Sequence, residues 1–354
     1  MQPQILRIID ANINRTGEGL RFLEDVARFL LNDSYLTEQL KALRHDIVQS
    51  VGDYGVNLLT RRDSEGDVGI LNTQTAEEKS DALSLVRANA KRVEESLRVM
   101  EELAKLPEVS SFLDSTKLQE ARFTVYTLEQ NLVSRLLRQD KKEKLMGLYV
   151  ILDTESLKGR DEVEAARAVI RGGAKVLQLR DKRRSRGELL PIADRLRTIC
   201  REAKVLFIIN DYLDLALAAD ADGLHIGQED LPLSVARKNL PIDKIIGYSI
   251  KTVAQAQKAE AEGADYLAVG AIFPSPTKPE SQVVGMGTLR QIKQAVSLPL
   301  VAVGGINQGN VDQALSTGGS VAVISAVFDE KDVEKATRRL VDKIEQSRLK
   351  VKGR

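Results

Sequence analysis

Eight short apolar runs, each followed by a helical pattern, constrain the fold of this 354-residue chain more than any other feature. Runs of this length next to glycines are typical of buried parallel strands, and strand–helix alternation predicts an α/β fold. Eight such units predict a (β/α)8 TIM barrel over residues 146–354, with an open doubly wound sheet as the alternative. The runs are Leu148–Leu152, Val176–Leu179, Leu206–Ile209, Gly223–Ile226, Ile245–Gly247, Tyr266–Val269, Leu300–Val303 and Val321–Ile324.

Residues 1–140 carry helical periodicity instead, over 5–31, 37–51, 76–106 and 115–137. Part of this pattern repeats at a constant offset of 77 residues, which predicts an all-α domain with an internal two-fold repeat. The repeated polar residues are Asn12, Arg15, Glu18, Arg21 and Glu24, which correspond to Asn89, Arg92, Glu95, Arg98 and Glu101. They suit either a salt-bridge network or a polar site between the halves. The charged loop 60–69 suits either a phosphate- or metal-binding lid or a plain surface loop. We place the domain boundary in the charged stretch 139–145.

The composition excludes several classes of function. Lysine and arginine number 52 against 51 acidic residues, so no overall field attracts nucleic acid or an anionic membrane. One cysteine (Cys200) and two histidines (His45 and His225) exclude an internal disulfide and a multi-histidine metal site. No apolar run reaches membrane-spanning length, and the N-terminus lacks a secretory pattern. We therefore expect a soluble cytoplasmic protein.

Polar residues stand at the ends of seven consecutive predicted strands, where barrel enzymes bind their ligands. In strand order they are Gln178, Arg180 and Lys182; Asn210 and Asp211; His225, Gln228, Glu229 and Asp230; Ser249; the loop 273–278 with Ser275 and Lys278; Gly304 and Gly305; and Ile324 and Ser325.

Two kinds of phosphate site can be built from these residues. Asp211 and Asp230 supply hard oxygen ligands that suit Mg²⁺, although Asp211 could instead cap the following helix. Arg180, Lys182 and Lys278 could neutralise a diphosphate beside that metal.

The second phosphate site uses mainly backbone amides. Gly304 and Gly305 expose N–H groups after the seventh strand, and Ser325 follows the eighth at a helix N-terminus. A tight turn is the alternative role of the glycines. For His225, flanked by apolar residues, a structural hydrogen bond is favoured over acid–base work.

Five motifs follow the predicted strands: Gln178-Leu179-Arg180-Asp181-Lys182, Asn210-Asp211, Gly223-Leu224-His225-Ile226-Gly227-Gln228-Glu229-Asp230, Pro276-Thr277-Lys278 and Val303-Gly304-Gly305-Ile306. Together they resemble the motifs of the thiamine-phosphate synthase family over residues 146–345. The resemblance implies a (β/α)8 barrel that joins hydroxymethylpyrimidine diphosphate to hydroxyethylthiazole phosphate with Mg²⁺. One departure is Ser275, where the family often has threonine; the hydroxyl is kept.

The resemblance also implies a role for each site residue. The pyrimidine diphosphate would contact Gln178, Leu179, Arg180, Asp181, Lys182, Asn210, Ser249 and Lys278, of which Arg180, Lys182, Ser249 and Lys278 would be catalytic. Asp211 and Asp230 would bind Mg²⁺. The thiazole phosphate would contact Ser275, Pro276, Thr277, Gly305, Ile324 and Ser325.

The repeated Asn-x-x-Arg pattern and the loop 62–69 resemble a helical domain fused to this synthase in some bacteria. That domain is similar to a proposed hydroxymethylpyrimidine phosphate kinase, and a structural or oligomerising module is the alternative. A homo-oligomer therefore stays open. For the whole chain the alternatives are a catalytically dead, phosphate-binding regulator and a barrel isomerase. The Asp211 and Asp230 pair and Lys278 argue against the regulator. An isomerase would need a carboxylate base close to the substrate carbon and no diphosphate site.

Overall fold

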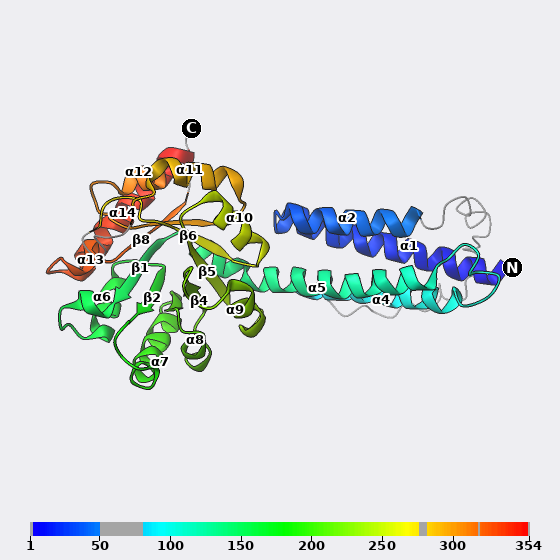
Figure 1. The fold of residues 1–354 in the computed structure, drawn as a ribbon, viewed down its shortest axis with the longest axis horizontal. Coiled ribbons are helices and arrows are strands. Elements are labelled where there is room, and N and C mark those ends of the chain that lie inside the picture. The colour runs from blue at the N-terminus through cyan, green and yellow to red at the C-terminus, as the bar shows by residue number, and fades with distance from the viewer. Residues whose placement is uncertain (1–2, 50–80, 276–281, 318, 353–354) are drawn as a thin grey trace. The chain divides into compact units, whose positions relative to one another are not determined.

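The computed structural model describes residues 3–49, 81–275, 282–317 and 319–352 (Figure 1). The chain divides into two compact units, Met1–Leu137 and Arg138–Arg354. Within the described ranges, no helix combines the length and the hydropathy needed to cross a membrane.

The first unit is helical, as its periodicity predicts. It holds α1 (Pro3–Asp25), the π-helical turn η1 (Val26–Leu30), α2 (Ser34–Gln49), α4 (Ala82–Leu103) and most of α5 (Ser115–Lys144). Helix α1 packs against both α2 and α4, and apolar side chains such as Leu20, Leu23 and Leu97 are fully buried between them. One helix end differs from the prediction. The helical pattern predicted over 115–137 continues to Lys144 in α5, because lysine and glutamate are good helix formers and cations favour a helix C-terminus.

Two buried carboxylates in this unit are each held by an arginine of another helix. Arg44 of α2 donates from Nε to Glu24 of α1 at 3.0 Å. Arg122 of α5 donates from Nε to Glu101 of α4 at 3.1 Å. Both glutamates are nearly inaccessible to solvent. Salt bridges between helices are therefore one use that the structure makes of the repeated residues.

The second unit is a closed barrel of eight parallel strands in sequence order, β1 to β8. The strands are β1 (Leu148–Asp153), β2 (Val176–Arg180), β3 (Leu206–Asn210), β4 (Gly223–Ile226), β5 (Ile245–Ile250), β6 (Tyr266–Gly270), β7 (Leu300–Val303) and β8 (Ser320–Val323). Pairing of β1 with β8, for example Leu148 opposite Val321, closes the sheet. The predicted TIM barrel is confirmed, and the open sheet is excluded.

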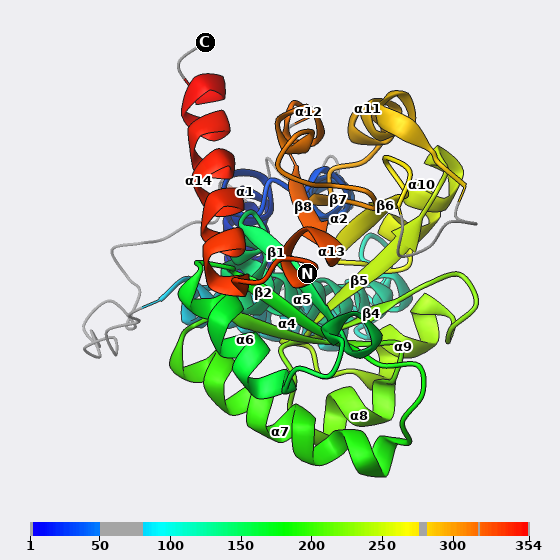
Figure 2. The ribbon, with the colours of Figure 1, turned by 90° about the vertical axis from the view of Figure 1, so that its left-hand side faces the viewer.

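Helices surround the strands on the outside (Figure 2). They are α6 (Glu162–Arg171), α7 (Arg186–Glu202), α8 (Leu213–Ala218), α9 (Leu233–Asn239), α10 (Val253–Ala261), α11 (Gly285–Ala295), α12 (Val311–Leu315), α13 (Ser325–Phe328) and α14 (Val333–Lys352), with the 3-10 turn η3 (Thr154–Leu157) after β1. The strands are largely apolar because one face packs on these helices and the other fills the barrel interior.

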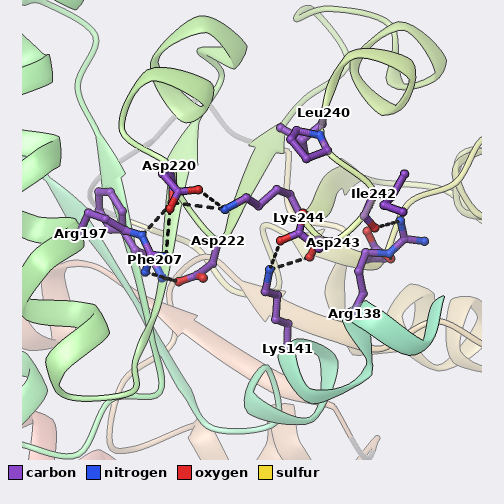
Figure 3. A network of polar contacts seen from close by, with 12 residues as sticks. Arg138, Lys141, Arg197, Phe207, Asp220, Asp222, Leu240, Ile242, Asp243 and Lys244 are labelled. Atoms are coloured by element: carbon purple, nitrogen blue, oxygen red, sulfur yellow. Dashed lines mark hydrogen bonds and ion pairs between the residues drawn. The ribbon is translucent and has the colours of Figure 1, made fainter. Parts of the chain in front are cut away.

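The N-terminal end of the barrel is tied to the last turns of α5 by ionic contacts. Arg138 donates to the carbonyl of Ile242 at 3.0 Å, and Lys141 donates to the carbonyl of Asp243 at 2.6 Å (Figure 3). Arg138 also pairs with the buried Asp265 at 2.9 Å. These contacts lie at the end of the strands opposite to the one where barrel enzymes work, so we assign them to stability.

Candidate active site at the carboxyl ends of the strands

Two adjoining hollows open at the carboxyl ends of the strands. The first, about 300 Å³, is lined by Gly304, Gly305 and Ser325 among others, and we call it the glycine lobe. The second, about 310 Å³, is lined by Asp211 and Asp230 among others, and we call it the carboxylate lobe. They adjoin because six residues line both: Arg180, Asn210, His225, Ser249, Lys251 and Gly270. The structure thus brings most of the predicted site residues together.

Both cations that follow β2 are held by carboxylates. Arg180 is the last residue of β2 and pairs with Asp153, the last residue of β1. Lys182 reaches across to pair with Asp211 after β3. Arg180 is largely buried, whereas Lys182 is half exposed, so Lys182 is the more adjustable of the two.

Asp211 and Asp230 face each other in the carboxylate lobe. Asp211 has φ of 64°, in the left-handed region, and its N–H donates to the carbonyl of His225 at 2.8 Å. Asp230 accepts a hydrogen bond from the N–H of Gly227 at 2.7 Å. Burial raises the pKa of Asp211, and the neighbouring Asp230 raises it further, while Lys182 opposes both effects. The first residue of α8 is preceded by Tyr212, so Asp211 does not cap that helix.

This donor set fits a divalent cation. Two carboxylates at close range repel each other, and a cation between them removes the cost of ionising both. Among the described residues, no three histidine, cysteine, aspartate or glutamate side chains gather in one place that could hold a metal. Asp211 and Asp230 would therefore leave most of the coordination shell to water or phosphate oxygens, which is how Mg²⁺ is usually bound.

The glycine lobe depends on two glycines with positive φ. Gly304 has φ of 93° and Gly305 has φ of 66°. A Cβ atom on Gly305 would lie 2.3 Å from the carbonyl oxygen of Pro274, so the loop after β6 closes directly on this turn. Glycine leaves backbone amides accessible to a small anion at this point. Ser275, Ile324 and Ser325 line the same lobe.

Asp181 braces the turn that carries the two cations. Its carboxylate accepts hydrogen bonds from the hydroxyl of Thr154 at 2.6 Å and from the backbone N–H groups of Arg183 and Arg184 at 2.7 and 2.8 Å. Burial alone would raise the pKa of Asp181, but these hydrogen bonds together hold it well below its usual range. Asp181 lines neither lobe.

Four other predicted contact residues are placed differently or not described. Leu179 is buried in the layer between the barrel and its helices and lines neither lobe. Pro276, Thr277 and Lys278, like the loop 60–69 of the first unit, lie outside the described residues.

Polar side chains from five strands that line the glycine lobe are joined by hydrogen bonds. Gln178 donates to the hydroxyl of Tyr149 at 2.7 Å, and Tyr149 is hydrogen-bonded to Tyr266 at 2.9 Å. Tyr266 is hydrogen-bonded to Nδ1 of His225 at 3.1 Å, and Nε2 of His225 is hydrogen-bonded to Ser249 at 2.9 Å. Burial lowers the pKa of His225 to about 4, so the ring is neutral at neutral pH.

The sequence reasoning missed Lys251, Asp153 and the two tyrosines. Lys251 lines both lobes and stands just past β5, so the strand-end rule could have found it. Asp153 is the last residue of β1, and the predicted set of strand-end residues begins only at the second strand. Tyr149 and Tyr266 gave no signal, because a buried aromatic residue in a strand is usually a packing residue.

Comparison with known proteins gives a match for each unit. Residues 148–327 match the family model for thiamine monophosphate synthase, and residues 7–131 match that of the ThiD2 family. The thiamine-phosphate synthase of Prochlorococcus marinus (strain MIT 9313) is 35% identical over 344 residues, which is 96% of either chain. That of Nostoc sp. (strain PCC 7120) is 36% identical over 353 residues, 97% of this chain and 95% of the relative. A solved structure of thiamine phosphate pyrophosphorylase from Pyrococcus furiosus is 42% identical with a TM-score of 0.55, over 58% of this chain and 98% of that one.

Proposed function

The chain belongs to the thiamine monophosphate synthase family, and we propose that the two lobes of its barrel hold the two substrates of that reaction. It is a thiamine-phosphate synthase, a transferase of thiamine biosynthesis. The reaction condenses 4-amino-2-methyl-5-(diphosphooxymethyl)pyrimidine with 4-methyl-5-(2-phosphoethyl)thiazole and releases diphosphate. One observation supports the assignment of residues: the carboxylate lobe, which is rich in charged side chains, adjoins the glycine lobe.

The diphosphate belongs in the carboxylate lobe. Arg180, Lys182 and Lys251 stand around it and would neutralise its oxygens, with Lys278 as a further cation. Asp211 and Asp230 would hold Mg²⁺, which when bound takes up negative charge on the departing diphosphate. Lys182 now pairs with Asp211 and would be released to the diphosphate as the site is filled.

The thiazole phosphate belongs in the glycine lobe. The backbone amides after β7 and the hydroxyl groups of Ser275 and Ser325 would bind its phosphate, with Pro276, Thr277, Gly305 and Ile324 completing the contacts. Binding by a remote phosphate orients the ring nitrogen toward the carbon that loses diphosphate. Orientation of this kind replaces a bimolecular encounter with a step inside one complex.

The chemistry then needs no side-chain nucleophile. The carbon–oxygen bond breaks, and its electrons leave with the diphosphate. The positive charge left on the methylene carbon is shared with the aminopyrimidine ring, so the step can be dissociative. The thiazole nitrogen donates its electron pair to form the new carbon–nitrogen bond. Side chains bind, orient and supply positive charge at the leaving group.

The residue assignment is tested with Asp211→Ala and Lys278→Ala in the full chain. We expect both variants to keep the circular dichroism spectrum and to lose nearly all turnover. Near-normal rates in both would exclude the assignment. A catalytically dead, phosphate-binding regulator would bind the substrates but release no diphosphate in the unmodified protein.

For the first unit we propose a kinase that makes the pyrimidine diphosphate from the monophosphate. The match to the ThiD2 family over residues 7–131 supports this proposal. We also propose that the unit is an internal two-fold repeat. Asn12 donates to the carbonyl of Ile8 at 2.7 Å and Asn89 donates to that of Leu85 at 2.9 Å, at positions 77 residues apart.

The kinase proposal is tested in the full chain carrying Asp211→Ala, so that the product accumulates. We expect ATP-dependent formation of the pyrimidine diphosphate. If no pyrimidine diphosphate forms, and the oligomeric state measured by sedimentation changes when residues 1–140 are removed, the unit would instead serve to oligomerise the chain.

A further inference from the structure

The hydrogen-bonded polar side chains that line the glycine lobe form one continuous series across the barrel interior, which we call the hydrogen-bond relay. It runs from Gln178 of β2 through Tyr149 of β1, Tyr266 of β6 and His225 of β4 to Ser249 of β5. The first four side chains are all less than 9% exposed, so water competes little for their hydrogen bonds. His225 and Ser249 line both lobes at the carboxyl ends of the strands, and the hydroxyl of Ser249 is the last member of the series.

One assignment of the hydrogen atoms gives every member of the relay a partner. The side-chain nitrogen of Gln178 can only donate, so the hydroxyl oxygen of Tyr149 accepts from it. In this assignment Tyr149 donates to Tyr266, and Tyr266 donates to Nδ1 of His225. The ring then carries its proton on Nε2, which donates to Ser249.

We propose that the relay fixes His225 as the Nε2–H tautomer and thereby makes the hydroxyl of Ser249 a hydrogen-bond donor to the ligand. The Ser249 oxygen accepts from His225, so its own hydrogen is left for an acceptor inside the cavity. In the proposed function that acceptor is the diphosphate, and this last step rests on the proposed function. His225 and Tyr266 are then positioning residues, because they act on the ligand through Ser249.

The packing around the relay supports this role. A Cβ atom on Gly247 would lie 2.0 Å from Cζ of Tyr266 and 2.5 Å from Nδ1 of His225. The glycine in β5 therefore leaves the room in which those two side chains meet. Other neighbours in the barrel interior, such as Val176, Ile208 and Val301, are apolar.

The direction of the relay can be measured without any substrate. The chain has two histidines, so ¹⁵N labelling of histidine gives two side-chain spin systems, and His45→Gln removes the exposed one. We expect the remaining ring to show the Nε2–H tautomer alone. We expect Tyr266→Phe, which removes the donor to Nδ1, to move the Nδ1 resonance and to mix the tautomers. An Nδ1–H tautomer or a charged ring in the otherwise unmodified chain would overturn the proposal.

The effect on the ligand is measured with inorganic diphosphate and Mg²⁺ by calorimetry. A hydrogen bond to a charged group predicts that Ser249→Ala weakens binding by about 10- to 100-fold. Tyr266→Phe should weaken binding about threefold to tenfold when Ser249 is present and have no effect in Ser249→Ala, since it acts through that hydroxyl. Equal losses in both backgrounds, with an unchanged circular dichroism spectrum, would show a general structural effect and refute the relay. Failure of the proposed residue assignment would appear in turnover and leave the tautomer measurement unaffected.

Discussion

The glycine lobe makes a sharp prediction for Gly305→Ala. A Cβ atom there would lie 2.3 Å from the carbonyl oxygen of Pro274 and 2.7 Å from that of Phe273, and ordinary contacts begin at 3.4 Å. One of the two loops must therefore retreat by about 1 Å. The backbone φ of 66° adds about 1–2 kcal/mol for a residue with a Cβ. A displacement of this size at a binding site can cost about 100-fold in rate, so we expect a loss of about 10- to 100-fold in kcat/KM.

The loss should fall on one substrate. Gly305 lines the glycine lobe but not the carboxylate lobe, so KM should rise for the thiazole phosphate and change little for the pyrimidine diphosphate. Steady-state kinetics with each substrate varied, together with thermal unfolding, measure this. Gly287→Ala in α11, where a Cβ meets nothing within 4 Å, is the matched control. Unchanged KM values, or equal rises for both substrates in a folded protein, would refute the reasoning.

Three further predictions concern charge. Because the pKa of Asp211 is raised, Mg²⁺ activation should be lost on acidification at a higher pH than an ordinary aspartate would give. Asp230→Asn removes the neighbouring carboxylate and should move that loss of activation to a lower pH. Profiles of activity against pH measure both effects. Asp265→Ala leaves the buried Arg138 and the partly buried Arg237 without their carboxylate, which should cost about 3–5 kcal/mol in denaturant unfolding while both KM values stay unchanged. Asp181→Asn should cost about 1–3 kcal/mol at neutral pH, and the gap from the unmodified protein should close as the pH falls through the lowered pKa of Asp181, below 3.8.

The barrel could be predicted because parallel strands buried on both faces are continuous apolar runs. Most predicted strand bounds differ from the observed ones by one residue or less, as in β2 and β3. Strand β5 is the exception: it continues for three residues beyond Gly247 and includes Ser249, because its pairing with β6 extends to Ile250 opposite Val269. Asp211 and Asp230 could be found because each follows a strand end.

What could not be predicted depends on partners far apart in the sequence. Tyr149 and Tyr266 become polar groups of the site only because the closed barrel brings their hydroxyls to 2.9 Å. Arg138 extends α5 beyond the predicted end partly because its partner Asp265 stands before β6. The local sequence around these residues does not indicate either contact.

The central claim is that Asp211 and Asp230 hold the metal that activates the diphosphate as a leaving group. The most direct test measures thiamine phosphate and diphosphate formation by the purified full chain while Mg²⁺ is titrated, in the unmodified protein and in Asp230→Asn. We predict equal amounts of the two products, complete loss of both with EDTA, and a Mg²⁺ requirement raised at least about tenfold in the variant, the equivalent of about 1.4 kcal/mol. Turnover that survives EDTA, or an unchanged Mg²⁺ requirement in Asp230→Asn, would contradict it.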